Sequence, residues 1–190
     1  MRTNKQYAVG GILVSATLLL SGCAVGSTSG PGMMGSSTNY YDSRLDCNVP
    51  ANLQGSIVKV VLSDMGMTRM MGGVAPMGAH MRLIASPSTI SSGASSIVVK
   101  NLGWRTHELV ILPLSKNTES GLRVPGADGK VSELGSLGEA SKNCGAGVGS
   151  GISSGSASWT TITLKPGRYE LICNLANHYA DGMYQELDVV

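Results

Sequence analysis

Short apolar runs, rich in β-branched residues and separated by glycine, proline and serine, constrain the fold of this chain more than any other feature. Runs of this length and composition are typical of β-strands. Strands are expected at residues 56–62, 81–85, 96–101, 107–112, 159–164, 168–173 and 184–189. Short strands with turn signals between them predict an all-β sandwich. Residues 132–143 are the one segment where a short helix is expected.

The composition agrees with this architecture. The chain has 190 residues, which is room for one domain of ordinary size with extensions. Apolar residues make up 42% of it, glycine occurs 26 times and phenylalanine is absent. The core is therefore expected to consist of aliphatic side chains and methionine rather than aromatic rings.

The N-terminus has the pattern of a secretory signal. Arg2 and Lys5 precede an apolar stretch at residues 8–20, and Leu-Ser-Gly-Cys follows, ending at Cys23. These four residues resemble a bacterial lipobox, which implies that residues 1–22 are a lipoprotein signal peptide and that Cys23 carries lipid. A single transmembrane anchor is the alternative, but the apolar run is short for a span.

Residues 23–51 are predicted to be a flexible Gly/Ser-rich tether, and residues 52–190 a globular domain. Removal of residues 1–22 takes away two cations and no acid, so the net charge falls from +2 to zero. A neutral protein without a basic run is not expected to bind nucleic acid or to adhere to membranes by charge. The lipid would anchor it to the bacterial cell membrane, on the periplasmic or outer surface.

Four side chains have the chemistry of a metal site. Cys173, His178 and Met183 follow one another at a spacing of Cys-x4-His-x4-Met, and His107 begins an upstream strand. One thiolate, two imidazoles and a weak thioether favour copper over a hard cation. Zinc, or a buried cysteine without a metal, is the alternative.

Strand alternation predicts where two of these side chains lie. Side chains two residues apart point to the same face of a strand. Cys173 therefore shares a face with Leu171, and His107 shares one with Leu109 and Ile111. Both are expected to point inward at one pole of the sandwich.

Two motifs in residues 52–190 resemble the cupredoxin family: N-L-G-W-R-T-H-E-L and Y-E-L-I-C-N-L-A-N-H-Y-A-D-G-M. The spacing in the second is most similar to the rusticyanin and sulfocyanin branch. The resemblance implies a Greek-key β-sandwich and a type 1 copper ion held by His107, Cys173, His178 and an axial Met183. It also implies one-electron transfer. The protein is expected to be a monomer.

The chain departs from the family pattern at two places. Relatives usually have Pro-Gly before the second histidine ligand, where this chain has Ala176 and Asn177. Asparagine tolerates the left-handed conformation that glycine would adopt there. Glu108 stands where many relatives have Asn or Ser, whose side chain ties the two ligand loops together.

The resemblance also implies a route for the electron. In the family it passes through the second histidine of the ligand loop, here His178, at the edge of the solvent. Leu175, Ala176, Tyr179 and Ala180 would form an apolar rim for a redox partner protein, which is expected to dock weakly over a small area.

A methionine-rich segment precedes the second predicted strand. Thioethers bind Cu(I), so the segment is a candidate second copper site. Its candidate ligands are Met65, Met67, Met70, Met71, Met77, His80 and Met81. Such a site would favour a second function: a copper-binding module for delivery, storage or resistance. Methionine as adaptable filler in a loop is the alternative.

Two cysteines remain once Cys23 is assigned to lipid and Cys173 to copper. Cys47 and Cys144 are predicted to form a disulfide, because a secreted chain matures in an oxidising compartment. The bond would join the end of the tether to the Gly/Ser-rich loop at residues 145–158.

Enzyme classes are excluded by what flanks the candidate ligands. A trinuclear copper cluster needs histidines on both sides of the cysteine, but Ile172 and Asn174 flank Cys173. A binuclear electron-entry site needs two bridging cysteines on the loop, and the loop has one. The sequence also has no nucleophile triad and no phosphate-binding loop, so no enzyme activity is expected.

Overall fold

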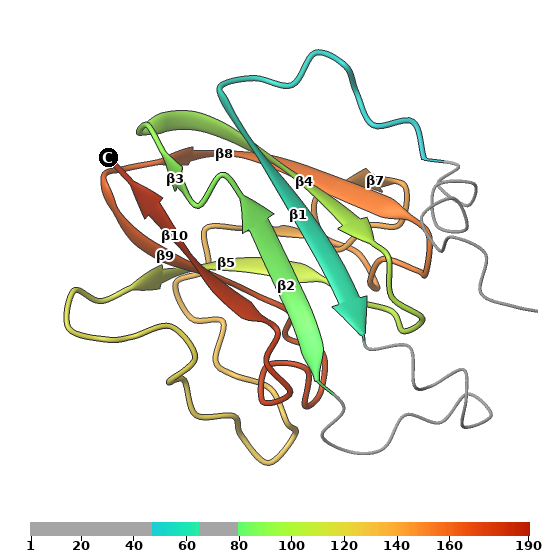
Figure 1. The fold of residues 1–190 in the computed structure, drawn as a ribbon, viewed down its shortest axis with the longest axis vertical. Coiled ribbons are helices and arrows are strands. Elements are labelled where there is room, and N and C mark those ends of the chain that lie inside the picture. The colour runs from blue at the N-terminus through green and yellow to red at the C-terminus, as the bar shows by residue number, and fades with distance from the viewer. Residues whose placement is uncertain (1–46, 65–79) are drawn as a thin grey trace, which may run out of the picture. The chain divides into compact units, whose positions relative to one another are not determined.

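The computed structural model describes residues 47–64 and 80–190, and this part of the chain is built of β-strands without a helix (Figure 1). The strands are β1 (Ser56–Asp64), β2 (Met81–Ser86), β3 (Thr89–Ile90), β4 (Gly93–Asn101), β5 (Leu109–Leu114), β6 (Gly138–Ala140), β7 (Gly145–Ala146), β8 (Ala157–Leu164), β9 (Gly167–Ile172) and β10 (Tyr184–Val189). None of the described segments contains a helix long and apolar enough to cross a membrane.

The strands form two five-stranded sheets that pack face to face, which confirms the predicted all-β sandwich. One sheet has the order β2-β1-β4-β8-β7, and the other has the order β3-β10-β9-β5-β6. Both sheets are mixed. In the first, β1 runs parallel to β4 and β4 is antiparallel to β8. In the second, β3 runs parallel to β10 and β10 is antiparallel to β9. The chain crosses between the sheets several times, so some neighbouring strands, such as β1 and β4 or β5 and β9, are not consecutive in sequence.

Alternation along the strands produces the main core between the sheets. β2 alternates strictly between buried and exposed positions, as a strand with one solvated face should. Leu171 and Cys173 lie in this core with Leu109 and Ile111, which confirms the predicted strand faces. His107 lies just before β5 rather than in it, and pairs with Ile152 in an isolated bridge through hydrogen bonds of 3.1 and 2.7 Å.

A second, smaller core covers the outer face of the β9–β5 sheet. Val110, Leu112 and Ile172 point away from the main core, yet each is at most 1% exposed. They pack against Val131 and Tyr179, and Tyr184 lies against the same cluster. The long connection between β5 and β6 therefore buries the outer face of this sheet, which strand alternation did not predict. The cluster consists of Val110, Leu112, Val131, Ile172 and Tyr179.

The helix expected at residues 132–143 is wrong. The segment contains a turn and then β6, whose Ala140 pairs with Leu109 of β5. Gly135 has a φ of +83°, a left-handed conformation that stops a right-handed helix. The free edge of β5 then offers this segment hydrogen bonds that a short helix could not replace. The two-residue strands β3 and β7 were not predicted either, because they lie in Ser- and Gly-rich sequence.

Cys47 and Cys144 form a disulfide, as predicted. The Cys47 sulfur also accepts a hydrogen bond from the Ala157 amide at 3.2 Å, at the start of β8. The end of the predicted tether is thus fixed to the β8 end of its sheet. The signal peptide, Cys23 and the methionines at positions 65, 67, 70, 71 and 77 lie outside the described residues.

Candidate metal centre

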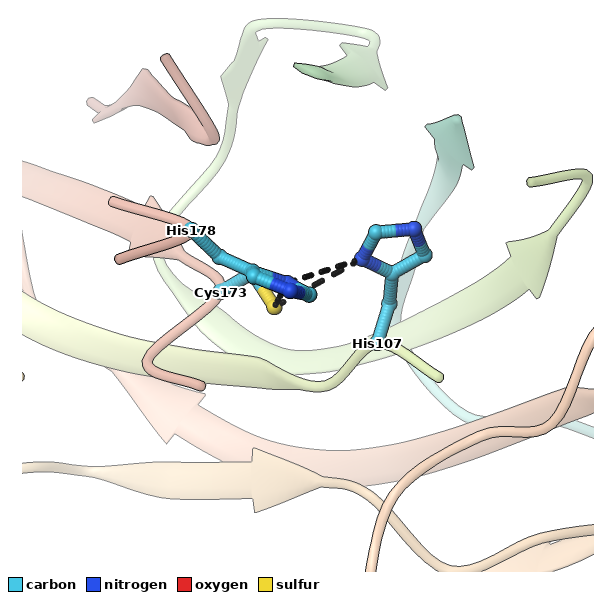
Figure 2. A group of neighbouring side chains, drawn as sticks. All are labelled: His107, Cys173 and His178. Carbon is cyan, nitrogen blue, oxygen red and sulfur yellow. Dashed lines mark hydrogen bonds between the residues drawn. The ribbon is translucent and has the colours of Figure 1, made fainter. Parts of the chain in front are cut away.

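Three buried side chains converge at one end of the sandwich (Figure 2). The Nδ1 atoms of His107 and His178 lie 3.1 Å apart. The Cys173 sulfur is 3.3 Å from Nδ1 of His178 and 3.9 Å from Nδ1 of His107. The histidines come from opposite sides of the cluster, one from the segment before β5 and the other from the loop after β9.

The cluster has the size of a trigonal metal site. With bonds of about 2.0–2.3 Å, as in zinc sites, a central ion separates nitrogen and sulfur donors by roughly 3.5–3.8 Å. The three observed distances lie close to this range, and the three atoms face one another. Two imidazole nitrogens and a thiolate that share one point fit a single soft or borderline cation.

Met183 is also positioned at this cluster. It is fully buried, and its carbonyl accepts a hydrogen bond from the Cys173 amide at 3.0 Å. Its own amide donates to the His178 carbonyl at 3.1 Å. One thiolate, two imidazoles and a nearby thioether are the donors of a type 1 copper site, and the residues present fit that ion.

Buried hydrogen bonds hold the segment that carries His107. The Asn101 side chain accepts from the Gly103 amide at 2.8 Å and donates to the carbonyls of Arg105 and Ile152 at 2.7 and 2.8 Å. Asn101 is fully buried, so these bonds are shielded from water. They shape the turn between β4 and His107 before any ligand binds.

Asp64, the last residue of β1, lies behind His107. Its carboxylate accepts hydrogen bonds from the amides of Trp104 and Arg105 at 2.7 and 2.8 Å. Burial raises the pKa of Asp64, but these bonds and the contact with His107 outweigh burial and hold the pKa at about 2. The residue is thus an anion at neutral pH.

Cys173 needs a cation to become a thiolate. Burial raises the pKa of the Cys173 thiol to about 12, although the Glu108 amide donates a hydrogen bond to the sulfur at 3.3 Å. Burial also lowers the pKa of His178 to about 4, assisted by repulsion from His107. At neutral pH the metal-free site thus has a neutral His178 and a protonated thiol, and a metal must displace the thiol proton.

The ligand loop is a compact series of turns. Asn177 has a φ of +69°, so the left-handed conformation expected at this position is confirmed. The Asn177 amide donates a hydrogen bond to the Gly129 carbonyl at 2.8 Å. The Asn177 carbonyl accepts one from the Asp181 amide at 3.0 Å. The loop forms this turn with Ala176 and Asn177 because asparagine accepts a left-handed backbone conformation.

Replacing Asn177 with alanine is expected to destabilise the domain by about 1–2 kcal/mol, because alanine lacks the short polar side chain that lets asparagine tolerate a positive φ. Asn177→Gly is the matched variant and should keep the wild-type stability within about 1 kcal/mol. Denaturant unfolding of the metal-free proteins measures both. Equal losses in the two variants would mean that the asparagine side chain, rather than the backbone conformation, matters here.

Asn174 ties the ligand loop to the long β5–β6 connection. Its side chain accepts from the Val131 amide at 2.8 Å and donates to the Val131 carbonyl at 2.9 Å. It also donates to the Glu133 carboxylate at 2.6 Å. Asn174 therefore anchors the ligand loop to the β5–β6 connection rather than to the segment that carries His107 and Glu108.

Glu108 is itself largely buried. Burial raises its pKa to about 7, and repulsion from Glu139 adds to the shift. In the metal-free protein, Glu108 and His178 therefore change stability in opposite directions with pH. The pKa of His178 falls from 6.5 to about 4 on folding, so the free energy of unfolding decreases as the pH drops from 6.5 toward 4. The pKa of Glu108 rises from 4.5 to about 7, so stability is lost as the pH climbs from 4.5 to 7.

The free energy of unfolding of the metal-free wild type is therefore expected to change little between about pH 4.5 and 6.5. In a Glu108→Gln variant it should rise with pH over this window, by up to about 1.4 kcal/mol per pH unit. Denaturant titrations at several pH values test this expectation. If the unfolding free energy of the variant changed with pH as little as that of the wild type, the raised pKa of Glu108 would be contradicted.

The predicted docking rim is partly wrong. Ala176 and Ala180 are exposed and Leu175 is half-buried, but Tyr179 is only 2% exposed. Its hydroxyl accepts from the Arg123 amide and donates to Glu170, each at 3.0 Å, so the ring belongs to the second core. His178 is 6% exposed and His107 fully buried, so His178 is the candidate ligand nearer to the solvent.

Sequence reasoning missed Asp64, Asn101 and Asn174. Each is a polar residue at or beside the end of a buried strand. Such a position is a signal for side-chain to backbone hydrogen bonds, although it does not identify the partner. Asn101 bonds to the nearby Gly103 and Arg105, and its third partner, Ile152, is 51 positions away. The hydrogen-bond partners described above for the Asp64 and Asn174 side chains lie 40 or more positions away.

Comparison with known proteins finds similar solved structures only. No family model and no curated protein sequence matches the chain. Auracyanin B is 16% identical, with a TM-score of 0.45, over 75% of this chain and 94% of its own. Rusticyanin from Thiobacillus ferrooxidans is 18% identical, with a TM-score of 0.41, over 80% of this chain and 91% of its own.

Auracyanin A, a "blue" copper protein from Chloroflexus aurantiacus, is 15% identical, with a TM-score of 0.41, over 70% of this chain and 98% of its own. The fit to copper described above comes from the side chains of this chain and their distances.

Proposed function

We propose that this protein is a type 1 copper protein that carries single electrons between redox partners outside the cytoplasm. The observation that carries the proposal is the convergence of the buried side chains of His107, Cys173 and His178, whose donor atoms lie 3.1–3.9 Å apart. Met183 would complete the ligand set as a weak axial donor. Copper bound there would supply reversible one-electron chemistry.

The residues around the site would make this exchange fast by moving little. Asn101 fixes the segment before His107, and Asn174 fixes the loop that carries Cys173 and His178. The main core surrounds the cysteine and excludes water, which disfavours the more highly charged oxidised site. A partner would approach at His178, against the exposed Ala176 and Ala180.

The proposal places the domain on a membrane through lipid at Cys23. The support is the apolar N-terminal stretch that ends at this cysteine. Residues 23–51 would act as the tether, and the protein would work as a monomer. One acyl chain binds membranes weakly, so firm anchoring requires several chains on the cysteine.

Radiolabelled palmitate supplied to bacteria that express the full chain should label the wild type and should not label Cys23→Ser. The variant should also move from the membrane fraction to the soluble fraction. Equal labelling of the two proteins would reject lipidation at this residue.

Visible and EPR spectra of the protein without residues 1–23 test the copper site. One equivalent of Cu(II) is expected to give an intense thiolate-to-copper absorption band that ascorbate bleaches and ferricyanide restores. Binding without such a band, or preference for zinc over copper, would reject the proposal.

Copper delivery or storage is the second candidate function, and the positions of two residues favour it. Asp64, which precedes the methionine-rich segment, lies at His107, and the Met81 amide donates to the Asp181 carbonyl at 3.0 Å. Asp64 thus lies against a candidate ligand, and Met81 contacts the loop that carries His178 and Met183. Cu(I) titration of Cys173→Ala should leave residual binding if the segment is a second site, and its absence would reject this function.

A further inference from the structure

A buried carboxylate faces the back of His107. Oδ2 of Asp64 lies 3.7 Å from Nε2 of His107, and the two side chains are 2% and 0% exposed. This distance is too long for a hydrogen bond but short for a charge contact where water is excluded. The ring nitrogen on the opposite side, Nδ1, faces Cys173 and His178.

His107 Nε2 stands out among the described residues. It is the one fully buried side-chain nitrogen or oxygen there that has no hydrogen-bond partner. A buried N–H group without an acceptor costs about 1–3 kcal/mol, so a proton on this nitrogen requires a nearby anion or acceptor. Asp64 is the anion at this position.

Gly103 permits this approach. A Cβ at position 103 would lie 2.8 Å from Oδ1 of Asp64 and 2.9 Å from Nε2 of His107. Any other side chain would displace one of the two groups. The hydrogen bond from the Gly103 amide to Asn101 holds the glycine in place beside them.

We propose that Asp64 is a positioning residue for the copper ligand His107. Its carboxylate favours the imidazole with the proton on Nε2, which leaves the Nδ1 lone pair free to face the metal. Its fixed negative charge behind the ligand favours Cu(II) over Cu(I) and lowers the reduction potential. This inference rests on the proposed copper function and adds the group that sets the potential from the His107 side.

Asp64 could instead have a purely structural role, because its carboxylate also accepts hydrogen bonds from the amides of Trp104 and Arg105. A purely structural carboxylate would affect stability without changing the potential or the histidine tautomer. These two readouts therefore separate the roles.

The test compares Asp64→Asn with Glu170→Gln, which removes the charge of another buried carboxylate, located on the outer side of the β9–β5 sheet. Both variants are loaded with copper, and their potentials are measured by redox titration of the blue band. We expect Asp64→Asn to have a higher potential than the wild type and a larger shift than Glu170→Gln. Equal shifts in the two variants, or no shift in Asp64→Asn, would overturn the inference.

A measurement on the wild type covers the case in which Asp64→Asn does not fold. Nitrogen-15 NMR of the metal-free wild type, where no metal fixes the tautomer, should show His107 protonated at Nε2, with this proton exchanging slowly with water. A proton on Nδ1, or rapid exchange at Nε2, would overturn the inference. A wild type that never forms the blue band would instead reject the proposed function, so the two failures are distinguishable.

Discussion

Cys173→Ala is expected to abolish the thiolate-to-copper band and the reversible reduction of the protein while leaving the fold intact. The band requires a copper–sulfur bond, and Cys173 is the one free cysteine in the part of the chain that the structure describes. The residue is fully buried, so the smaller side chain should lower the unfolding free energy of the metal-free protein by about 1 kcal/mol. Absorption, EPR and cyclic voltammetry measure the loss.

Cys173→Ser is the matched control, because serine has nearly the same size and offers an oxygen in place of sulfur. It should also lose the intense band, but it should retain weak Cu(II) binding through the histidines. Retention of the band in either variant would show that the copper–thiolate bond involves a different cysteine.

Glu170→Ala is expected to have the largest effect on stability. Glu170 is fully buried under the β5–β6 connection and accepts hydrogen bonds from Ser120, the Gly121 amide, Arg123 and Tyr179. Burial raises the pKa of Tyr179 to about 12, so its hydroxyl remains a donor at neutral pH. Without the carboxylate, the donors and the mostly buried Arg123 cation lose their partner, which should cost about 3–5 kcal/mol.

Glu186→Ala is the control. Glu186 lies directly opposite Glu170 on the neighbouring strand β10 and forms an ion pair with Arg168. Both side chains of this pair are about 30% exposed, so solvent screens the interaction and its loss should be much smaller. Denaturant unfolding of the metal-free variants compares them. Similar losses would mean that burial under the connection does not determine the strength of the Glu170 network.

The burial of Glu170 is a feature that strand alternation could not predict. Strand alternation places Glu170 on the face opposite Leu171 and Cys173, as the structure has it. That face would be solvated in a simple sandwich, yet the β5–β6 connection covers it. The connection has no hydrophobic period, so its sequence does not indicate which surface it packs against.

The candidate ligands were predictable because their chemistry and spacing are local. Cys173, His178 and Met183 lie within one loop, and a thiolate, an imidazole and a thioether at that spacing limit the choice of metal. The left-handed conformation of Asn177 was predictable for a similar reason, because few residue types tolerate it.

By itself, the sequence determined the all-β class, the inward faces of β5 and β9 and the disulfide, and it identified the candidate ligands. These follow from side-chain alternation and donor chemistry, which depend on the residues themselves and their near neighbours. Only the tertiary structure brought Asp64 to the back of His107, joined Asn174 to Val131 and buried Glu170. Those contacts depend on how distant segments pack. A buried polar side chain at a strand end requires a hydrogen-bond partner, but the local sequence does not identify that partner.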